Sequence, residues 1–275
     1  MIIGIDLGGT KVAGGVLVKG RLVRCAQRPT EAAKGRARVI ANIRALIDDL
    51  ARGGRITAVG IGVPGTYRGT RIANLPNVTA LNGVDLKRAL KLACPVALDN
   101  DLRCVARAET RMGAAKGAMV ALIVNVGTGI GTSYVINGAP YRGAHGNAGE
   151  AGHQWLDASH NEWEHILSGP ALLARYHQLG GKGAHASAAW TDRSRAGARL
   201  REEATELLSR FIRNLIITLD PDRIVLVGGA ITPAYARAVA SRLRSWGLRI
   251  TVRRARVKDP GVVGAASLVE RPQRS

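Results

Sequence analysis

The sequence predicts an α/β fold built from two similar domains, and two observations lead to this prediction. Strand-like apolar runs alternate with helical patterns along the chain. In addition, one plan (strand, Gly/Thr-rich turn, strand, tight turn, strand) occurs twice, with the copies about 120 residues apart. Such a repeat indicates a duplicated domain with a cleft between the copies. We expect domains at residues 1–113 and 114–259, and a C-terminal helix at about 260–270 that returns to the first domain.

The first domain is expected to open with three strands, because short apolar runs are separated by turns that include Lys19-Gly20. A stripe of apolar residues at helical spacing follows and ends at Gly53-Gly54. In order, the expected elements are strands at Ile2–Ile5, Val12–Val18 and Arg21–Ala26, a helix over 36–52, a strand at Thr57–Val63, a short helix at Asp85–Ala93, a strand at Pro95–Leu98 and a helix at Asp101–Met112.

The second domain restarts the plan with a strand at Ala118–Val126, a second strand up to Ile136 and an Asn137-Gly138 hairpin turn. The remainder reads as mostly helical. The expected elements are helices over roughly 161–180, 198–219 and 233–245 and strands at Ile224–Val227 and Leu248–Val252.

Composition excludes several classes of protein. No apolar run approaches the ~18 residues of a transmembrane helix, and the first residues lack the basic segment of a signal peptide. Three cysteines without a CxxC pair indicate a reducing cytoplasm, without disulfides or a cysteine-built zinc site. The formal net charge of +20 would suit a polyanionic partner, but Arg outnumbers Lys 32 to 8, which a skewed gene composition also explains.

Two glycine-rich turns are candidate phosphate-binding loops. The first, Asp6-Leu7-Gly8-Gly9-Thr10-Lys11, offers backbone N–H groups, a hydroxyl and an ammonium to phosphate, and its Asp6 would suit a phosphate-bound metal ion. The second, Asn125–Gly131, has the same character, and Asn125 takes the place of Asp6. Either turn alone could be purely structural, whereas the related pair indicates a nucleoside triphosphate held between the domains.

Two polar segments are candidates for substrate chemistry. Asp99-Asn100-Asp101 joins a strand to a helix, where Asp and Asn commonly cap, but Asp101 there could also deprotonate a hydroxyl that attacks a γ-phosphate. The segment His145–His153 presents Glu150 and His153 three residues apart among small residues, and Glu164 follows. This pattern suits a small polyol, while two carboxylates and a histidine could also hold a metal.

The motifs resemble those of the ROK family (repressor, open reading frame, kinase) and span almost the whole chain in order. They are IDLGGTK (5–11), GIGVPG (60–65), DND (99–101), NVGTGIG (125–131), GAHGNAGEAGH (143–153) and SGPAL (168–172). The resemblance implies a two-lobed actin/hexokinase-like (ribonuclease H-like) α/β fold with duplicated βββαβα domains. It also implies closure on ATP, Mg²⁺ and a hexose, and a homodimer.

The resemblance assigns roles to individual residues. It makes Asp101 the general base for the sugar 6-hydroxyl. The implied sugar-binding residues are Gly65, Asn74, Asn100, Asp101, Glu150, His153 and Glu164. The implied ATP-binding residues are Asp6, Gly8, Gly9, Thr10, Lys11, Gly127, Thr128, Gly129, Gly131, Gly228 and Gly229, and Ala230 stands where a third glycine is common.

One departure from the family concerns its zinc motif, CxCGxxGCxE, in which three cysteines and a histidine bind the metal. The three cysteine places hold Trp155, Asp157 and Glu162, so we expect no structural zinc. A replacement site of His153, Asp157, His160 and Glu162 is an alternative, as is a plain polar surface. Because the zinc loop helps to position the sugar-binding histidine in the family, its loss leaves the identity of the sugar open.

The leading hypothesis is a cytoplasmic, ATP-dependent hexose kinase similar to glucokinase, a phosphotransferase with an alcohol acceptor and no membrane or nucleic-acid partner. N-acetylmannosamine, fructose and mannose are the alternative sugars. Inorganic polyphosphate is the alternative donor, because residues 224–258 contain eight Arg or Lys and no Asp or Glu. A non-catalytic sugar-sensing regulator is a further alternative. A DNA-binding repressor is not favoured, because the first motif begins at residue 5 and leaves no room for a helix-turn-helix.

Overall fold

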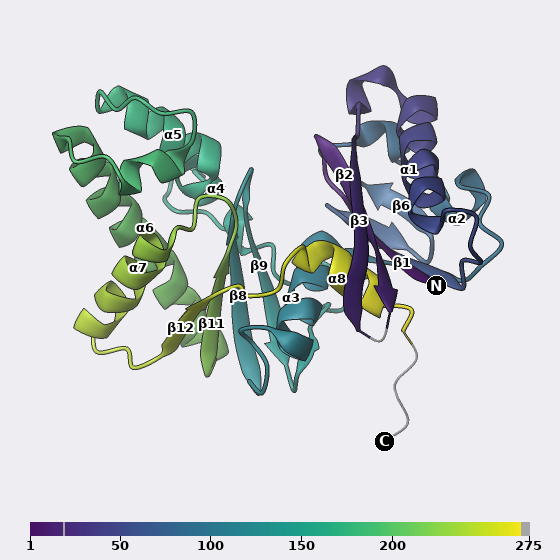
Figure 1. Cartoon of the computed structure of the whole chain (residues 1–275). Coiled ribbons are helices and arrows are strands. Elements are labelled where there is room, and N and C mark those ends of the chain that lie inside the picture. Colours follow the sequence, from purple (N-terminus) through teal and green to yellow (C-terminus); the bar gives the residue numbers. More distant parts are fainter. Residues whose placement is uncertain (19, 271–275) are drawn as a thin grey trace. The chain divides into compact units, whose positions relative to one another are not determined.

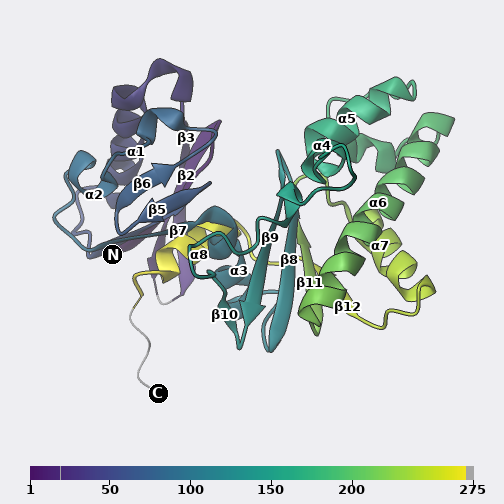
Figure 2. The ribbon, with the colours of Figure 1, turned by 180° about the vertical axis from the view of Figure 1, so that it is seen from behind.

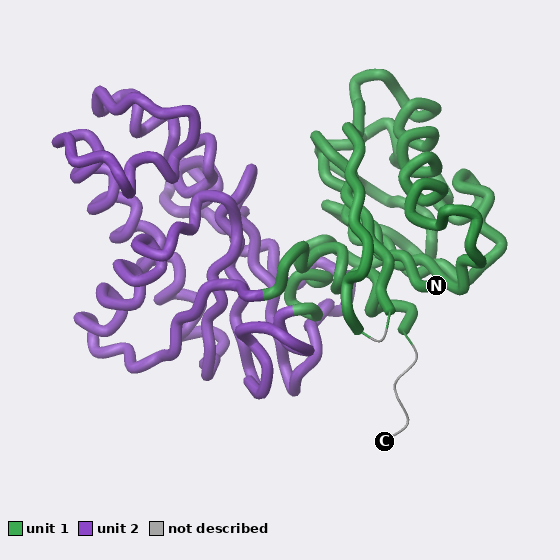
Figure 3. The backbone as a smooth tube through the Cα atoms, in the orientation of Figure 1, with its two compact units in different colours: residues 1–108, 257–275 green, residues 109–256 purple. Residues whose placement is uncertain are grey.

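The computed structural model describes residues 1–18 and 20–270, and Figure 3 shows its two units. Unit 1 comprises Met1–Ala108 with Val257–Ser275, and unit 2 comprises Glu109–Arg256. The chain therefore passes from one unit to the other twice, first within helix α3 (Asp101–Met112) and again after Arg256. Of the expected Lys19-Gly20 turn, Lys19 lies outside the described residues.

Unit 1 is built on a five-stranded sheet of order β3-β2-β1-β4-β7. Its strands are β1 (Ile2–Leu7), β2 (Lys11–Val18), β3 (Arg21–Pro29), β4 (Ala58–Val63) and β7 (Val96–Asn100). The first three strands form an antiparallel meander, and β1, β4 and β7 run parallel. The carboxyl ends of β1, β4 and β7 therefore meet at one edge of the sheet.

Helices α1 (Arg36–Ala51) and α8 (Pro260–Ser267) cover this sheet, as Figures 1 and 2 show. Ile5 lies on the α1 side, since a Cβ at Gly14 would meet both Ile5 and the α1 residue Leu50. The adjacent Gly4 lies on the α8 side, where a Cβ would overlap the backbone of α8. Because successive strand residues face opposite sides, the two helices pack on opposite faces.

Small residues allow α8 to approach the sheet and α3 closely. A Cβ at Gly60 of β4 would overlap the carbonyl oxygen of Ala265, and one at Gly264 would overlap the carbonyl oxygen of Cys104 in α3. Any side chain at these two glycines would have to push the backbones apart. The glycines are therefore required by packing rather than by backbone conformation.

Between β4 and β7 the chain forms a small two-stranded sheet, β5 (Thr66–Arg68) with β6 (Arg71–Asn74), and a short helix, α2 (Leu86–Ala89). The helix expected over Asp85–Ala93 was therefore too long. Asp85 caps α2 by accepting a hydrogen bond from Arg88 N, and Lys91 adopts a φ of 51°, which no helix continues through. The strand expected at Pro95–Leu98 extends to Asn100, so two residues of the DND motif belong to β7.

Unit 2 repeats the sheet with the order β10-β9-β8-β11-β12. Its strands are β8 (Val120–Val126), β9 (Ile130–Ile136), β10 (Ala139–Pro140), β11 (Arg223–Val227) and β12 (Thr251–Arg254). As in unit 1, three antiparallel strands are followed by two parallel ones. Asp6 pairs with Ala13 and Asn125 pairs with Gly131, in each case in the last but one pair before the turn. The predicted duplication is confirmed.

Helices cover one face of the second sheet (Figures 1 and 2). They are α4 (Glu164–Leu167), α5 (Gly169–Gln178), α6 (Arg195–Leu219) and α7 (Pro233–Ser245). The helix expected over 161–180 is in fact two, because Ser168 has an extended ψ of 155° and caps α5 with its hydroxyl. The strand expected at Leu248–Val252 begins later, since Leu248 N bonds back to Leu243 O and closes the end of α7.

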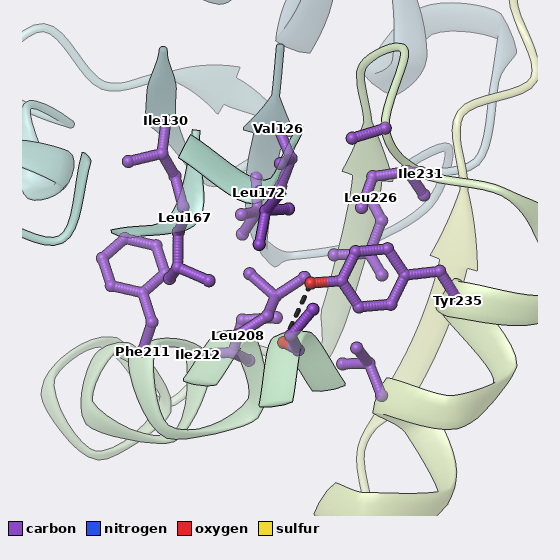
Figure 4. Close-up of a cluster of buried hydrophobic side chains, with 14 of the residues drawn as sticks. Val126, Ile130, Leu167, Leu172, Leu208, Phe211, Ile212, Leu226, Ile231 and Tyr235 are labelled. Carbon is purple, nitrogen blue, oxygen red and sulfur yellow. Dashed lines mark hydrogen bonds between the residues drawn. The ribbon is translucent and has the colours of Figure 1, made fainter. Parts of the chain in front are cut away.

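The core of unit 2 lies between these helices and the sheet, and Figure 4 shows part of it. Phe211 and Leu208 of α6 pack there with Val126 of β8. Tyr235 is fully buried, and its hydroxyl donates a 2.9 Å hydrogen bond to the carbonyl oxygen of Ala204. Burial holds the pKa of Tyr235 far above its usual value. Among the described helices, none has the length and hydropathy to cross a bilayer.

Candidate functional site

The candidate residues of unit 1 gather at the edge where its parallel strands end. The Asp6–Lys11 turn follows β1, Gly65 follows β4, and Asn100 with Asp101 ends β7 and begins α3. Ligands of open α/β sheets bind at this edge, outside the carboxyl ends of the strands. The topology therefore brings together the unit 1 residues that the sequence singled out.

The first glycine-rich turn is fixed by hydrogen bonds at Gly8 and is exposed to solvent at Thr10 and Lys11. Gly8 N donates to Lys11 O at 3.0 Å, and the buried Thr30 donates its hydroxyl to Gly8 O at 2.6 Å. A Cβ at Gly9 would crowd Asn77 at 2.9 Å. Thr10 and Lys11 are exposed, which leaves the hydroxyl and the ammonium accessible to a ligand. Thr30 and Asn77 are not among the residues predicted from the sequence, because their proximity to this turn has no local sequence signal.

Asp6 has an unfavourable electrostatic environment. It is half-buried in β1, and the first turn of α8 comes so close that a Cβ at Gly261 would overlap its carboxylate. Burial raises the pKa of Asp6 to about 6; the nearby Lys11 ammonium opposes this rise, and Asp259 adds to it. A poorly solvated carboxylate of this kind is stabilised by a cation. The position fits one carboxylate ligand of a Mg²⁺ ion whose other ligands are phosphate oxygens and water.

The three residues of the DND motif have three different environments. Asp99 is almost fully buried and accepts hydrogen bonds from Arg103 Nε at 2.7 Å and Tyr67 OH at 3.0 Å. Asn100 caps α3: its Oδ1 accepts hydrogen bonds from Leu102 N at 3.0 Å and from Arg103 N at 3.2 Å. Asp101 is half-buried in the first turn of α3, where the helix N-terminus favours its negative charge. The motif is thus a buried anchor, a cap and a partly accessible carboxylate.

Gly65 and Asn74, two further candidates, lie against each other. Gly65 has a φ of 154°, and a Cβ there would overlap the carbonyl oxygen of Asn74. Asn82 steadies the same segment, because its Oδ1 accepts from Leu75 N at 2.8 Å and its Nδ2 lies 3.4 Å from Asn74 Oδ1. Asn74 itself is exposed.

In unit 2 the second glycine-rich loop and the Gly228-Gly229 turn lie side by side, after β8 and β11. Gly127 N donates to Gly129 O at 2.9 Å, and Gly127 O accepts from Gly169 N, at the start of α5, at 2.7 Å. A Cβ at Gly228 would overlap the carbonyl oxygen that ends β8. Gly229 and Thr128 are exposed. This edge of the second sheet is thus the counterpart of the Asp6–Lys11 edge of the first.

Glu164 contacts the glycine-rich loop directly. Its Oε2 accepts a 3.0 Å hydrogen bond from Ile130 N, and the same oxygen would clash with a Cβ at Gly129. The carboxylate therefore supports the loop that includes Thr128 and Gly131. The family resemblance assigns Glu164 to the sugar, and its contact with the candidate phosphate loop is not predicted from the sequence.

The segment that carries Glu150 and His153 packs on strand β9. Thr132 donates its backbone N–H and its hydroxyl to Gly149 O, at 3.1 and 2.7 Å. A Cβ at Gly152 would overlap the carbonyl oxygen of Ile130. Glu150 and His153 are exposed on this fixed backbone. This close packing explains Gly149 and Gly152, two of the glycines of the motif.

His153 is paired with Glu162. The two side chains approach to 2.7 Å between Nδ1 and Oε2. This hydrogen bond raises the pKa of His153, and it lowers the pKa of Glu162. The sequence places Glu162 at a zinc-cysteine position and in an alternative metal site with His153, but it does not predict a direct hydrogen bond between the two side chains.

The residues at the other two cysteine places have partners of their own. Trp155 forms an isolated β-bridge with Glu162, and its ring lies 3.9 Å from that of His160. The Asp157 carboxylate accepts from Ser159 N and from Asn161. Within residues 1–18 and 20–270, no group of three His, Cys, Asp or Glu side chains is arranged to hold a metal ion. A replacement metal site is therefore not formed there, and the absence of zinc stays a prediction.

The basic stretch 224–258 includes the Gly228-Gly229 turn, and its Arg254 lies close to that turn. Arg254 ends β12, and its Nε donates to Ile231 O at 3.1 Å, just after the Gly228-Gly229 turn. Arg242 instead pairs with two carboxylates of α6. Arg254 and Arg242 of the basic stretch thus lie in different surroundings.

Comparison with known proteins gives consistent results. Residues 2–271 match the ROK family profile. An N-acetyl-D-glucosamine kinase of Escherichia coli is 30% identical over 301 residues, covering 98% of this chain and 99% of that protein. A ROK family glucokinase from Streptomyces griseus, solved with glucose and AMPPNP, has a TM-score of 0.85 and 25% identity over 97% of this chain and 98% of that one. A ROK hexokinase from Thermus thermophilus has a TM-score of 0.80 and 29% identity, with 96% of each chain covered.

Proposed function

The chain belongs to the ROK family, and from this premise we propose that it is an ATP-dependent sugar kinase that phosphorylates the 6-hydroxyl of a hexose. Glucose is the first candidate, and N-acetylhexosamines and fructose are the alternatives. Support comes from relatives named as glucokinase, hexokinase and N-acetyl-D-glucosamine kinase. The observation that carries the proposal is Asp101, a partly accessible carboxylate at the sheet edge that also holds the Asp6–Lys11 turn.

Asp101 would act as the general base. Its carboxylate would accept the proton of the sugar hydroxyl as that oxygen attacks the γ-phosphorus, a contribution of about 10²–10⁴ to the rate. The motif fixes this carboxylate in place: Asn100 caps the helix on which it stands, and the buried Asp99–Arg103 pair anchors the junction between β7 and α3. Positioning of this kind is the main contribution of a protein to phosphoryl transfer.

Each unit has one glycine-rich turn that is a candidate for binding the phosphates of ATP. In the first, the exposed Thr10 hydroxyl and Lys11 ammonium are available to phosphate oxygens; in the second, Thr128 is. Gly228 and Gly229 would border the adenosine. Asp6 would hold Mg²⁺ together with the phosphates, and when bound this ion supplies positive charge that neutralises the phosphate oxygens.

Each unit, taken by itself, has candidate side chains for recognition of the sugar. Asn74, Asn100 and the backbone at Gly65 are the candidates of unit 1, and Glu150, His153 and Glu164 those of unit 2. The exposed Glu150 and His153 can accept or donate hydrogen bonds to hydroxyl groups. Such groups discriminate strongly against analogues that lack the matching hydroxyl.

The test is ADP release from Mg·ATP over a panel of hexoses and N-acetylhexosamines. Asp101→Asn is compared with the wild type and with Asp48→Asn, which removes an exposed carboxylate of α1 in the same unit. We expect turnover of one sugar, a loss of about 10²-fold or more in Asp101→Asn, and wild-type rates in the control. Absence of turnover with every sugar, from folded protein, would contradict the proposal. Arms with polyphosphate as donor, and with sugar binding alone, would then distinguish the alternatives.

A further inference from the structure

We propose that Glu162 is the positioning residue of the sugar site: its carboxylate holds the imidazole of His153 so that Nε2 is the ring atom offered to a sugar hydroxyl. This inference rests on the proposed function, in which His153 binds the sugar. It adds a residue that belongs neither to the candidate sugar-binding set nor to the candidate ATP-binding set described above.

The contact between the two side chains determines which ring nitrogen carries a proton. Nδ1 of His153 lies 2.7 Å from Oε2 of Glu162, and the lowered pKa of Glu162 keeps its carboxylate ionised. An ionised carboxylate only accepts hydrogen bonds, so Nδ1 must be the donor. Nε2 makes no hydrogen bond within the described part of the chain. In the neutral ring it is consequently the acceptor that remains for a ligand.

The backbone on the His153 side of the contact is fixed. His153 directly follows Gly152, which lies so close to the Ile130 carbonyl oxygen of β9 that no side chain would fit. The backbone N–H of His153 donates to Glu150 O at 3.2 Å, within the short 3-10 turn Ala151–His153. The ring can therefore rotate, but its point of attachment cannot move far.

The backbone on the Glu162 side is fixed as well. The next residue, Trp163, is buried, and its ring packs 5.5 Å from that of Phe211 in the core of unit 2. Glu162 is bridged to Trp155, and Trp163 N donates to Gln154 O at 3.4 Å. Residues 154–163 thus form a hairpin whose base joins the core.

The tip of this hairpin is closed by its own side chains. Asp157 accepts from Ser159 N at 2.9 Å and from Asn161 Nδ2 at 2.9 Å, and Leu156 N donates to Asn161 O at 2.5 Å. The hairpin is held together by these bonds and by the ring contact of Trp155 with His160. Two anchored segments therefore meet through the pair of His153 and Glu162.

Removal of the carboxylate should affect the sugar and leave the nucleotide unaffected. Without Glu162 the ring of His153 can rotate and can move its neutral-form proton to Nε2, which turns the acceptor into a donor. We expect Glu162→Ala to raise KM for the sugar on the order of tenfold, the lower range of losses for residues that orient a histidine through its second nitrogen. KM for ATP should stay within about twofold, because no candidate phosphate contact is touched.

The kinetic test uses a cycle with matched controls. Glu162→Gln keeps an acceptor for Nδ1–H and should restore most of the loss, whereas Glu202→Gln removes a carboxylate elsewhere in unit 2 and should change nothing. In a His153→Gln background, Glu162→Ala should have no further effect on the sugar KM. Circular dichroism and the melting temperature of each variant show whether it is folded. An equal effect of Glu162→Ala with and without His153 would overturn the proposal.

A second measurement does not depend on catalysis. Two-bond ¹H–¹⁵N NMR spectra of the full chain, with the His153 signals assigned from His153→Gln, report which ring nitrogen is protonated. We expect Nδ1–H in the neutral ring of the wild type and mainly Nε2–H in Glu162→Ala. An Nε2–H ring in the wild type would refute the role of Glu162. If no sugar were phosphorylated, the proposed function would fail, and this spectrum would still decide the pairing.

Discussion

Replacement of Asp6 by Asn should make the protein more stable while abolishing its activity. The pKa of Asp6 is raised from 3.8 to about 6, chiefly by burial, so the folded state disfavours the ionised carboxylate. Two pKa units at ~1.4 kcal/mol each correspond to ~3 kcal/mol at neutral pH. Asp6 is half-buried and partly screened by solvent, so we expect a gain of about 1–2 kcal/mol in the free energy of unfolding.

The gain should depend on pH in a defined way. Below pH 3.8 Asp6 is protonated in the folded and in the unfolded state, and it does not lower the free energy of unfolding. As pH rises to about 6, Asp6 ionises first in the unfolded state, and the folded state loses stability relative to it. The wild type therefore bears the full cost above pH 6. The advantage of Asp6→Asn should be complete at pH 7.5, about half as large at pH 5, and absent near pH 3.5.

Urea unfolding followed by far-UV circular dichroism, at pH 7.5 and at pH 5, measures this difference. All four tryptophans lie in Glu109–Arg256, so tryptophan fluorescence reports on unit 2 and shows in the same samples whether the two units unfold together. A variant that is no more stable than the wild type at pH 7.5 would refute the reasoning. A gain of the same size at both pH values would refute it as well, because its cause would then not be the charge.

Three other substitutions test packing and buried polar contacts. Gly264→Ala should destabilise the fold by about 1–3 kcal/mol in thermal unfolding, despite the better helix propensity of Ala, because the new methyl overlaps a carbonyl oxygen of α3. Gly229→Ala has open space around the new methyl and should be near neutral in the same measurement. Asp99→Asn should cost about 3–5 kcal/mol in urea unfolding, since it removes the negative charge from the buried pair of Asp99 and Arg103; a cost below 1 kcal/mol would contradict that role. Tyr235→Phe should cost about 1–2 kcal/mol, as a buried hydrogen bond is lost, and an unchanged melting temperature would argue against it.

Local patterns were sufficient for most of the secondary structure. Apolar spacing over 36–52 predicted α1, and the Asn137-Gly138 pair predicted a hairpin in which both residues have positive φ, as they do. The repeated strand plan predicted two related sheets, and both have the same order. These features depend on residues a few positions apart, and for that reason a single sequence reveals them.

Element limits were predicted less well, because neighbours in space decide them. Ser168 interrupts what reads as one helix, since its extended backbone and capping hydroxyl let α5 begin against Gly127 O. The strand after α7 starts three residues late because Leu248 closes the helix end. In both cases a contact within the folded unit overrides the local preference of the sequence, and the spacing of apolar residues does not reveal such a contact.

The candidate site shows the same division. Motifs named Lys11, Asp101 and His153, because the chemistry of a phosphate or a sugar requires particular side chains at particular spacings. Only the tertiary structure revealed that Glu162 holds His153 and that Gly261 presses against Asp6. In the second case the partners are more than 250 residues apart in the chain. Burial, pKa and the orientation of a ring depend on such partners, and their identity depends on the folded path of the backbone, which local spacing does not encode.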